Sequence, residues 1–246
     1  MKGIYRFSAL IIAALVAIPA GFGQSQSSAS DTSGGTSQQE AVDLMIIRES
    51  VKEDSLEQKL IALEFTGSLL EQGDTNDAIR IALQRLSLEG TNAQNRESGR
   101  IKNDFPQVRR EAARQLGALG TEEAKIALLQ VCISDNEPLV LQEAVRALGE
   151  IGIDNDGEVV GTIVWVTNKY NNSVAPDNFL ALAAIDALDK LAKNNGVRAD
   201  GYHLLVTIAE GNYASPVKER AKQSLANIRS TVTNNSKEKK NQGQPK

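Results

Sequence analysis

Residues 104–152 carry one helical pattern written twice, and this repeat constrains the fold more than any other feature. Six positions recur at a spacing of 32 residues. They are Pro106, Val108, Ala112, Leu116, Gly117 and Gly120 in the first copy and Pro138, Val140, Ala144, Leu148, Gly149 and Gly152 in the second. A period of about 30–45 residues built from paired apolar helices is typical of helical solenoids. The alternative is an ordinary helical bundle with a chance repeat.

The apolar spacing within each copy is helical. Val108, Ala112 and Leu116 lie four residues apart, which places them on one face of a helix. Alanine at the centre of that face allows a neighbouring helix to approach closely. Asp104 and Asp135 lie just ahead of the two helices, where a short acceptor can satisfy free N–H groups.

The segment from Asp104 to Gly117, Asp-x-x-x-Val-Arg-x-x-Ala-x-x-x-Leu-Gly, resembles HEAT-like repeats, including the short variety found in phycobilin lyases. This resemblance implies an α-solenoid fold and a binding or scaffolding role, because such repeats are rarely catalytic. The phycobilin-lyase likeness is carried over as fold only. The second copy departs at Leu141, where the family usually carries arginine, and this puts an Asp–Arg ladder between repeats in question at that position.

The remaining helices continue the alternation. Ala184 and Ala221 have the same place in two later helices as the alanines of the first repeat. Residues 158–170 have strand-like composition, but their position between two helices of one type favours a helix. The sequence therefore predicts an all-α fold, an α-solenoid of about five HEAT-like helical hairpins over residues 40–229.

Both ends of the chain differ from this repeat domain. Residues 1–23 begin with Lys2 and Arg6, continue with an apolar run and end in small residues, which is the order of a secretory signal peptide. The run is short for a membrane span, and a retained anchor is the alternative. Residues 24–39 and 230–246 are polar and are predicted to be a disordered linker and a disordered tail. We expect a periplasmic or secreted protein with no stable membrane span after signal cleavage.

Composition argues against several classes of function. The formal net charge is -4, and loss of Lys2 and Arg6 would make the mature chain more acidic, which is unfavourable for nucleic-acid binding. Cys132 is the single cysteine and is expected to be buried in a helix, and His203 is the single histidine. A zinc site normally needs several such ligands. We expect no catalytic residue, no metal and no cofactor.

Basic residues cluster on and after a polar segment, residues 89–103, that is longer than a usual helix connection. The candidate partner-binding residues are Arg96, Arg100 and Lys102 on this loop, Arg110 and Arg114 on the following helix, and Arg146 and Asp186 in a polar row two residues after each central alanine. The functional hypothesis is that these basic residues bind an acidic partner. The alternative is a solvated loop whose charges pair with nearby carboxylates.

These observations favour an exported, non-catalytic scaffold or adaptor that binds another protein, of unknown identity, through its solenoid surface. Two other classes remain open. One is an accessory subunit or an enzyme with unrecognised chemistry. The other is a structural component of the envelope, although the few aromatic residues argue against stacking on sugars.

Overall fold

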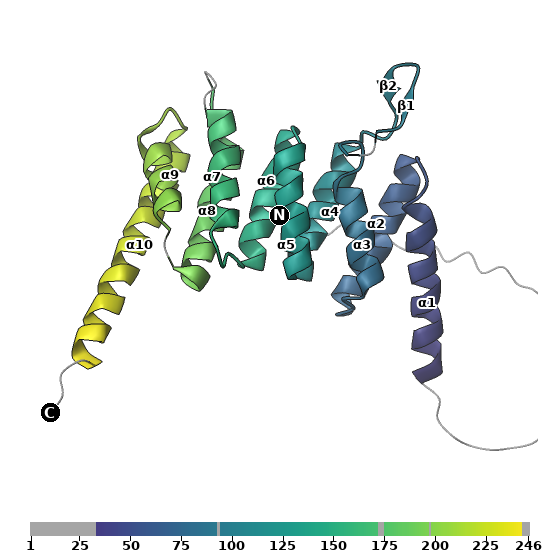
Figure 1. The fold of residues 1–246 in the computed structure, drawn as a ribbon, viewed down its shortest axis with the longest axis horizontal. Coiled ribbons are helices and arrows are strands. Elements are labelled where there is room, and N and C mark those ends of the chain that lie inside the picture. The colour runs from purple at the N-terminus through teal and green to yellow at the C-terminus, as the bar shows by residue number, and fades with distance from the viewer. Residues whose placement is uncertain (1–32, 93, 172–174, 197, 243–246) are drawn as a thin grey trace, which may run out of the picture.

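A computed structural model describes residues 33–92, 94–171, 175–196 and 198–242 of the chain (Figure 1). In this part the chain forms ten helices and one short pair of strands. The helices form five antiparallel hairpins: α1 (Ser33–Ser50) with α2 (Leu56–Glu71), α3 (Asp77–Ser87) with α4 (Pro106–Leu119), α5 (Glu122–Ser134) with α6 (Pro138–Ile151), α7 (Glu158–Asn171) with α8 (Asn178–Asn195), and α9 (Ala199–Glu210) with α10 (Ser215–Gln242).

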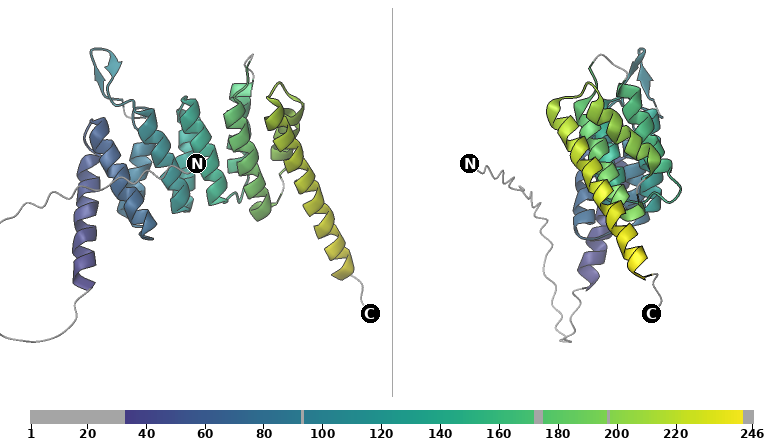
Figure 2. Two further views of the ribbon diagram at one scale, coloured as in Figure 1. Left: turned by 180° about the vertical axis from the view of Figure 1, so that it is seen from behind. Right: turned by 90° about the vertical axis from the view of Figure 1, so that its left-hand side faces the viewer.

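The hairpins stack side by side, so that the odd-numbered helices form a first row and the even-numbered helices a second row. Each helix packs against its hairpin partner and against the next helix of its own row. Figures 1 and 2 show the resulting array, with α1 at one end and α10 at the other. The predicted all-α solenoid of five hairpins is confirmed.

Small residues bring the helices of the second row close together. Ala112 and Ala144 are completely buried, as their central place in the repeat predicts. A Cβ atom added at Gly117 would lie 2.8 Å from the Cβ of Ala147, on the neighbouring helix α6. Atoms in van der Waals contact do not approach so closely, so a larger residue at this position would force α4 and α6 apart.

Helix α7 is the element whose composition suggested a strand. Val159, Ile163 and Val166 are fully buried along one face of it. Their spacing of three and four residues suits a helix in contact with its neighbours, and packing overrides the β-propensity of valine and isoleucine. The prediction of a helix here is confirmed.

The two end helices extend beyond the predicted repeat boundaries. Helix α1 begins at Ser33 instead of near residue 40, and α10 continues through Arg229 to Gln242. No proline or glycine lies between Pro216 and Gly243, so nothing in the sequence ends α10 at residue 229. The proposed signal peptide, residues 1–23, lies outside the described residues.

The long segment between α3 and α4 contains a two-stranded ribbon that the sequence did not predict. Strand β1 (Arg96–Glu97) pairs antiparallel with β2 (Arg100–Ile101), and Glu97 lies opposite Arg100. Ser98 and Gly99 form the turn with φ angles of 51° and 81°, the left-handed conformation of a tight β-hairpin. Figure 1 shows this ribbon projecting from the long edge of the array at which α3 ends and α4 begins. We call residues 94–102 the basic hairpin.

Candidate functional site

A clamp of buried polar side chains closes the base of the basic hairpin. The Asn103 amide donates to Glu89 Oε1 at 2.7 Å, and its Oδ1 accepts from the backbone N–H of Asn95 at 2.9 Å. Gly90 lies so close to the Asn103 carbonyl that an added Cβ would collide with it. The two ends of the inserted segment are therefore held together as one unit.

Lys59 connects this base to the first repeat. Its side chain is 1% exposed, and its ammonium group donates to Glu89 Oε2 at 2.8 Å and to the Val51 carbonyl at 2.7 Å. The carboxylate of Glu89 thus accepts from an ammonium group and an amide inside the protein. A buried charge is tolerated only where it is paired and hydrogen-bonded in this way.

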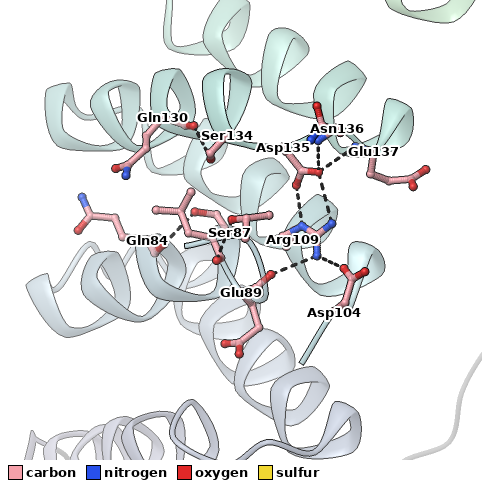
Figure 3. A network of polar contacts seen from close by, with 12 residues as sticks. Gln84, Ser87, Glu89, Asp104, Arg109, Gln130, Ser134, Asp135, Asn136 and Glu137 are labelled. Atoms are coloured by element: carbon pink, nitrogen blue, oxygen red, sulfur yellow. Dashed lines mark hydrogen bonds and ion pairs between the residues drawn. The ribbon is translucent and has the colours of Figure 1, made fainter. Parts of the chain in front are cut away.

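Arg109 connects the same base to the third repeat (Figure 3). Its Nη1 donates to Asp104 Oδ1 at 2.7 Å and to the Glu89 carbonyl at 3.1 Å, while its Nε donates to Asp135 Oδ2 at 2.6 Å. Burial opposes the charged guanidinium, but the hydrogen bonds to Asp135 and Asp104 outweigh it and raise the pKa of Arg109. The loop that carries the basic hairpin is therefore fixed on both sides.

The two aspartates ahead of α4 and α6 bond to groups other than the first N–H groups of these helices. Asp135 accepts from Arg109 and, at 2.8 and 2.9 Å, from the N–H groups of Asn136 and Glu137, which precede α6; the N-cap residue Glu137 has no side-chain cap hydrogen bond. Asp104 does not cap α4, whose N-cap residue is Phe105 and has no side-chain cap hydrogen bond. Its carboxylate accepts from the guanidinium of Arg109 instead.

A charged ladder runs along the second row and stops where the sequence departs from the repeat pattern. Lys59, Arg109 and Leu141 each lie three residues before the central alanine of their helix. The first two reach carboxylates of the following repeat, Glu89 and Asp135. Leu141 is fully buried and cannot form such a bond. Lys59 was not among the predicted site residues: its spacing to Ala62 matches that of Arg109 to Ala112, but this spacing does not reveal the buried partner Glu89.

The three candidate residues of the basic hairpin are all exposed. Lys102 forms an ion pair with Glu97 at 2.7 Å, and this hydrogen bond raises the pKa of Lys102 and lowers that of Glu97. Arg96 donates to Gln94 Oε1 at 2.7 Å. Arg100 forms no ion pair with any residue in the described part of the chain. Two of the three positive charges are thus without a carboxylate partner there.

The two candidates on α4 differ in their surroundings. Arg110 is exposed in the first turns of the helix, directly after the basic hairpin, and pairs with no carboxylate among the residues that the structure describes. Arg114 lies one turn further and forms an ion pair with Glu111 at 2.6 Å, which raises its pKa. Arg110 therefore extends the basic surface, whereas the charge of Arg114 is offset by its own helix.

The remaining candidates form the predicted polar row on the second row of helices, away from the basic hairpin. Arg146 is exposed on α6 and pairs with Glu143 at 2.8 Å. Asp186 on α8 accepts from Arg220 of α10 at 2.8 Å. Each of these two charges is thus offset by a partner. Arg96, Arg100 and Lys102 share the basic hairpin and Arg110 follows on α4, whereas Arg146 and Asp186 lie on α6 and α8.

Chemically reactive groups are sparse in the part of the chain that the structure describes. No three potential metal-ligating side chains meet there. Cys132 is completely buried, and burial raises the pKa of its thiol to about 12, so it packs as an apolar residue. His203 is exposed on α9, and its ring meets that of Tyr202 edge-on. Within the same residues, every helix is too short or too polar to cross a membrane.

Comparison with known proteins supports the repeat assignment. The family model of HEAT repeats matches residues 98–163, from the basic hairpin through α4, α5 and α6 into α7. No curated protein matches the chain, and the likeness to phycobilin lyases finds no support in this match. With the helical hairpins described above, the match shows that this chain carries HEAT-like repeats, a kind of fold that generally mediates protein interactions.

Proposed function

We propose that this protein is an exported, non-catalytic scaffold that binds an acidic partner protein through the basic hairpin and the adjoining turns of α4. Export is supported by the signal-peptide pattern of residues 1–23, which favours the periplasm or the outside of the cell. A solenoid offers a continuous surface along its helix rows, which suits an extended partner.

The observation that carries the proposal is the buried base of the basic hairpin. Desolvating an ion costs several kcal/mol unless its partners are well placed, so a base of paired buried charges holds the loop in one conformation. Here Lys59, Glu89, Asn103 and Arg109 are all buried and bonded to one another or to the loop. They hold an exposed ribbon on a chain of net negative charge, and two of its arginines, Arg96 and Arg100, pair with no carboxylate among the described residues.

The test is capture of the native partner by charge-reversal variants. Arg96→Glu, Arg100→Glu and Arg110→Glu are introduced together into the mature protein, and crosslinking with pull-down from the native envelope is compared. We expect unchanged helical content by circular dichroism and weaker capture. Capture by the unaltered protein should also fall as salt rises, because exposed charges are screened over about 8–10 Å at 0.1–0.15 M salt.

A matched control changes the net charge equally at the far end of the solenoid. Lys193→Glu, Lys218→Glu and Lys222→Glu lie on α8 and α10. Equal loss of capture in the two triple variants would mean that the partner senses only net charge, and the hairpin would then lose its assigned role.

A further inference from the structure

An apolar cleft lies between α1 and α3 on the first row of helices, with a volume of about 180 Å³. Its floor is formed by Leu44, Ile47, Val51, Ala78 and Ala82. Ile47 and Val51 are 1% and 4% exposed, so the floor belongs to the core of the first two repeats. Ile81 lines the cleft from α3 and is itself 57% exposed, so part of the apolar lining is open to solvent.

Every charged residue that lines this cleft is basic. Arg48 lies in the last turn of α1, Lys52 follows directly after that helix, and Arg85 lies in the last turn of α3. Lys52 pairs with Glu49 of its own helix segment at 2.8 Å. Arg48 and Arg85 are exposed and form no ion pair with any residue that the structure describes. We call this feature the cationic cleft.

The opposite side of α1 has the reverse character. A wider groove of about 500 Å³ there is lined by Val42, Met45 and Ile46 together with two carboxylates, Glu49 and Glu53. An acidic ligand would be repelled from that groove and attracted to the cationic cleft. The two sides of one helix therefore provide an internal comparison.

The basic residues of the cationic cleft lie at the same long edge of the array as the basic hairpin. These residues are in the last turns of α1 and α3 or directly after them, and Figure 1 shows the hairpin projecting from this edge. The Asn95 amide at the base of the hairpin donates to Asp54 Oδ1, in the α1–α2 loop, at 2.6 Å. The base of the hairpin is therefore joined to the loop that directly follows the basic residues of α1.

We propose that the cationic cleft receives a single apolar side chain from an acidic segment of the partner protein. The flanking carboxylates of that segment contact Arg48 and Arg85 and continue toward Arg96 and Arg100. The volume is below the roughly 300–1,000 Å³ of small-molecule sites and has room for one such side chain. Buried apolar anchors surrounded by polar contacts dominate many protein interfaces. This inference rests on the proposed function, because it assumes an acidic partner.

The experiment separates the apolar anchor from the electrostatic attraction by means of two labelled peptides. One has the sequence Ser-Glu-Glu-Leu-Glu-Glu-Ser, and the other has alanine in place of leucine. Fluorescence anisotropy gives the Kd of each peptide for the mature protein, without residues 1–23, at low salt. We expect the leucine peptide to bind about tenfold more tightly, because its side chain buries more apolar surface.

Two variants of the cleft remove this preference if the inference is right. Ala78→Leu fills the cleft, and Ile81→Glu places a carboxylate at its edge. In both, the ratio of the two Kd values should fall to about one, while Met45→Glu on the opposite side of α1 keeps the tenfold ratio. Thermal unfolding of Ala78→Leu checks its fold, and the exposed position of Ile81 makes the second variant safe for folding. A ratio that survives in both cleft variants, or that is already one in the unaltered chain, overturns the inference.

Other occupants of the cleft give distinct outcomes. If the chain is a dimer that Ile81→Glu dissociates, a second copy fills the cleft and the inference is wrong. The triple variant of Arg96, Arg100 and Arg110 tests the proposed function separately. It should weaken both peptides equally and leave their ratio at about ten; if it weakens neither, the hairpin proposal fails while the anchor stands.

Discussion

The side chains of Glu89 and Asn103, fourteen residues apart in the chain, meet in a 2.7 Å hydrogen bond beneath an exposed β-ribbon. This bond joins the two ends of the segment between α3 and α4. Lys59 of the first repeat completes the contact from α2. The inserted segment is therefore closed at its base, and the helices on either side of it, α3 and α4, still pack against each other as a hairpin.

Lys59→Met should destabilise the protein far more than the same change at Lys52. Removing the ammonium group leaves the buried carboxylate of Glu89 without its cation, and breaking such a buried pair costs about 3–5 kcal/mol. Lys52 pairs with Glu49 on the surface, and its loss should cost about 0–1 kcal/mol. Urea unfolding measures both. Adding Glu89→Gln to Lys59→Met should restore part of the stability; no recovery would show that the charge of Glu89 is not the cause.

Ala144→Leu and Arg146→Ala should differ although the residues are two positions apart. Ala144 is completely buried where α6 meets its neighbours in the second row, and overpacking such a contact costs about 1–3 kcal/mol. Arg146 is exposed, and a surface change usually stays within about 0.5 kcal/mol. Equal shifts of the urea midpoint would contradict the assigned helix faces.

A β-branched residue at Gly99 should disturb the turn of the basic hairpin without lowering the stability of the solenoid. Gly99 has a φ of 81°, a conformation that a β-branched residue adopts only with strain of about 1–3 kcal/mol. Gly99→Val should open the ribbon locally, so that trypsin cleaves after Arg96 or Arg100 faster, with little change in the melting temperature. Gly99→Asn is the matched control, because asparagine tolerates this conformation. Similar cleavage of the two variants would argue against the left-handed turn.

Periodic features of the fold could be predicted from the sequence, because they depend on local spacing. The alternation of Val108, Ala112 and Leu116 defines one helix face, and its recurrence defines the stack. The same rhythm identified α7 against the strand propensity of its residues. The glycines at 120 and 152 end their helices with φ angles of 69° and 68°, as helix-terminal glycines commonly do.

Features that depend on contacts between distant residues could not be predicted. Lys59 pairs with Glu89 thirty residues away, and a single lysine in a helix is usually a surface residue. Strands of two residues are too short to show an alternating pattern, so the sequence predicts only a loop at the ribbon. The pairing of Arg114 with Glu111 could have been predicted, because residues three positions apart share a helix face.

Cys132 should make stability depend on pH above about 9. Burial raises the pKa of its thiol from an ordinary value near 9 to about 12, so in this range the unfolded chain releases a proton that the folded chain keeps. The unfolded state is then favoured as pH rises, and the free energy of unfolding should fall by at most about 1.4 kcal/mol per pH unit between pH 9 and 12. Cys132→Val lacks the thiol and should lose this contribution, so the stability difference between the two proteins must change with pH.

The same burial predicts that iodoacetamide at pH 8 alkylates Cys132 only in urea, because the thiolate is the reactive form and is absent from the folded protein. Rapid alkylation of the native protein would show that the α5–α6 hairpin opens readily and that this part of the core is less tightly packed than its burial indicates.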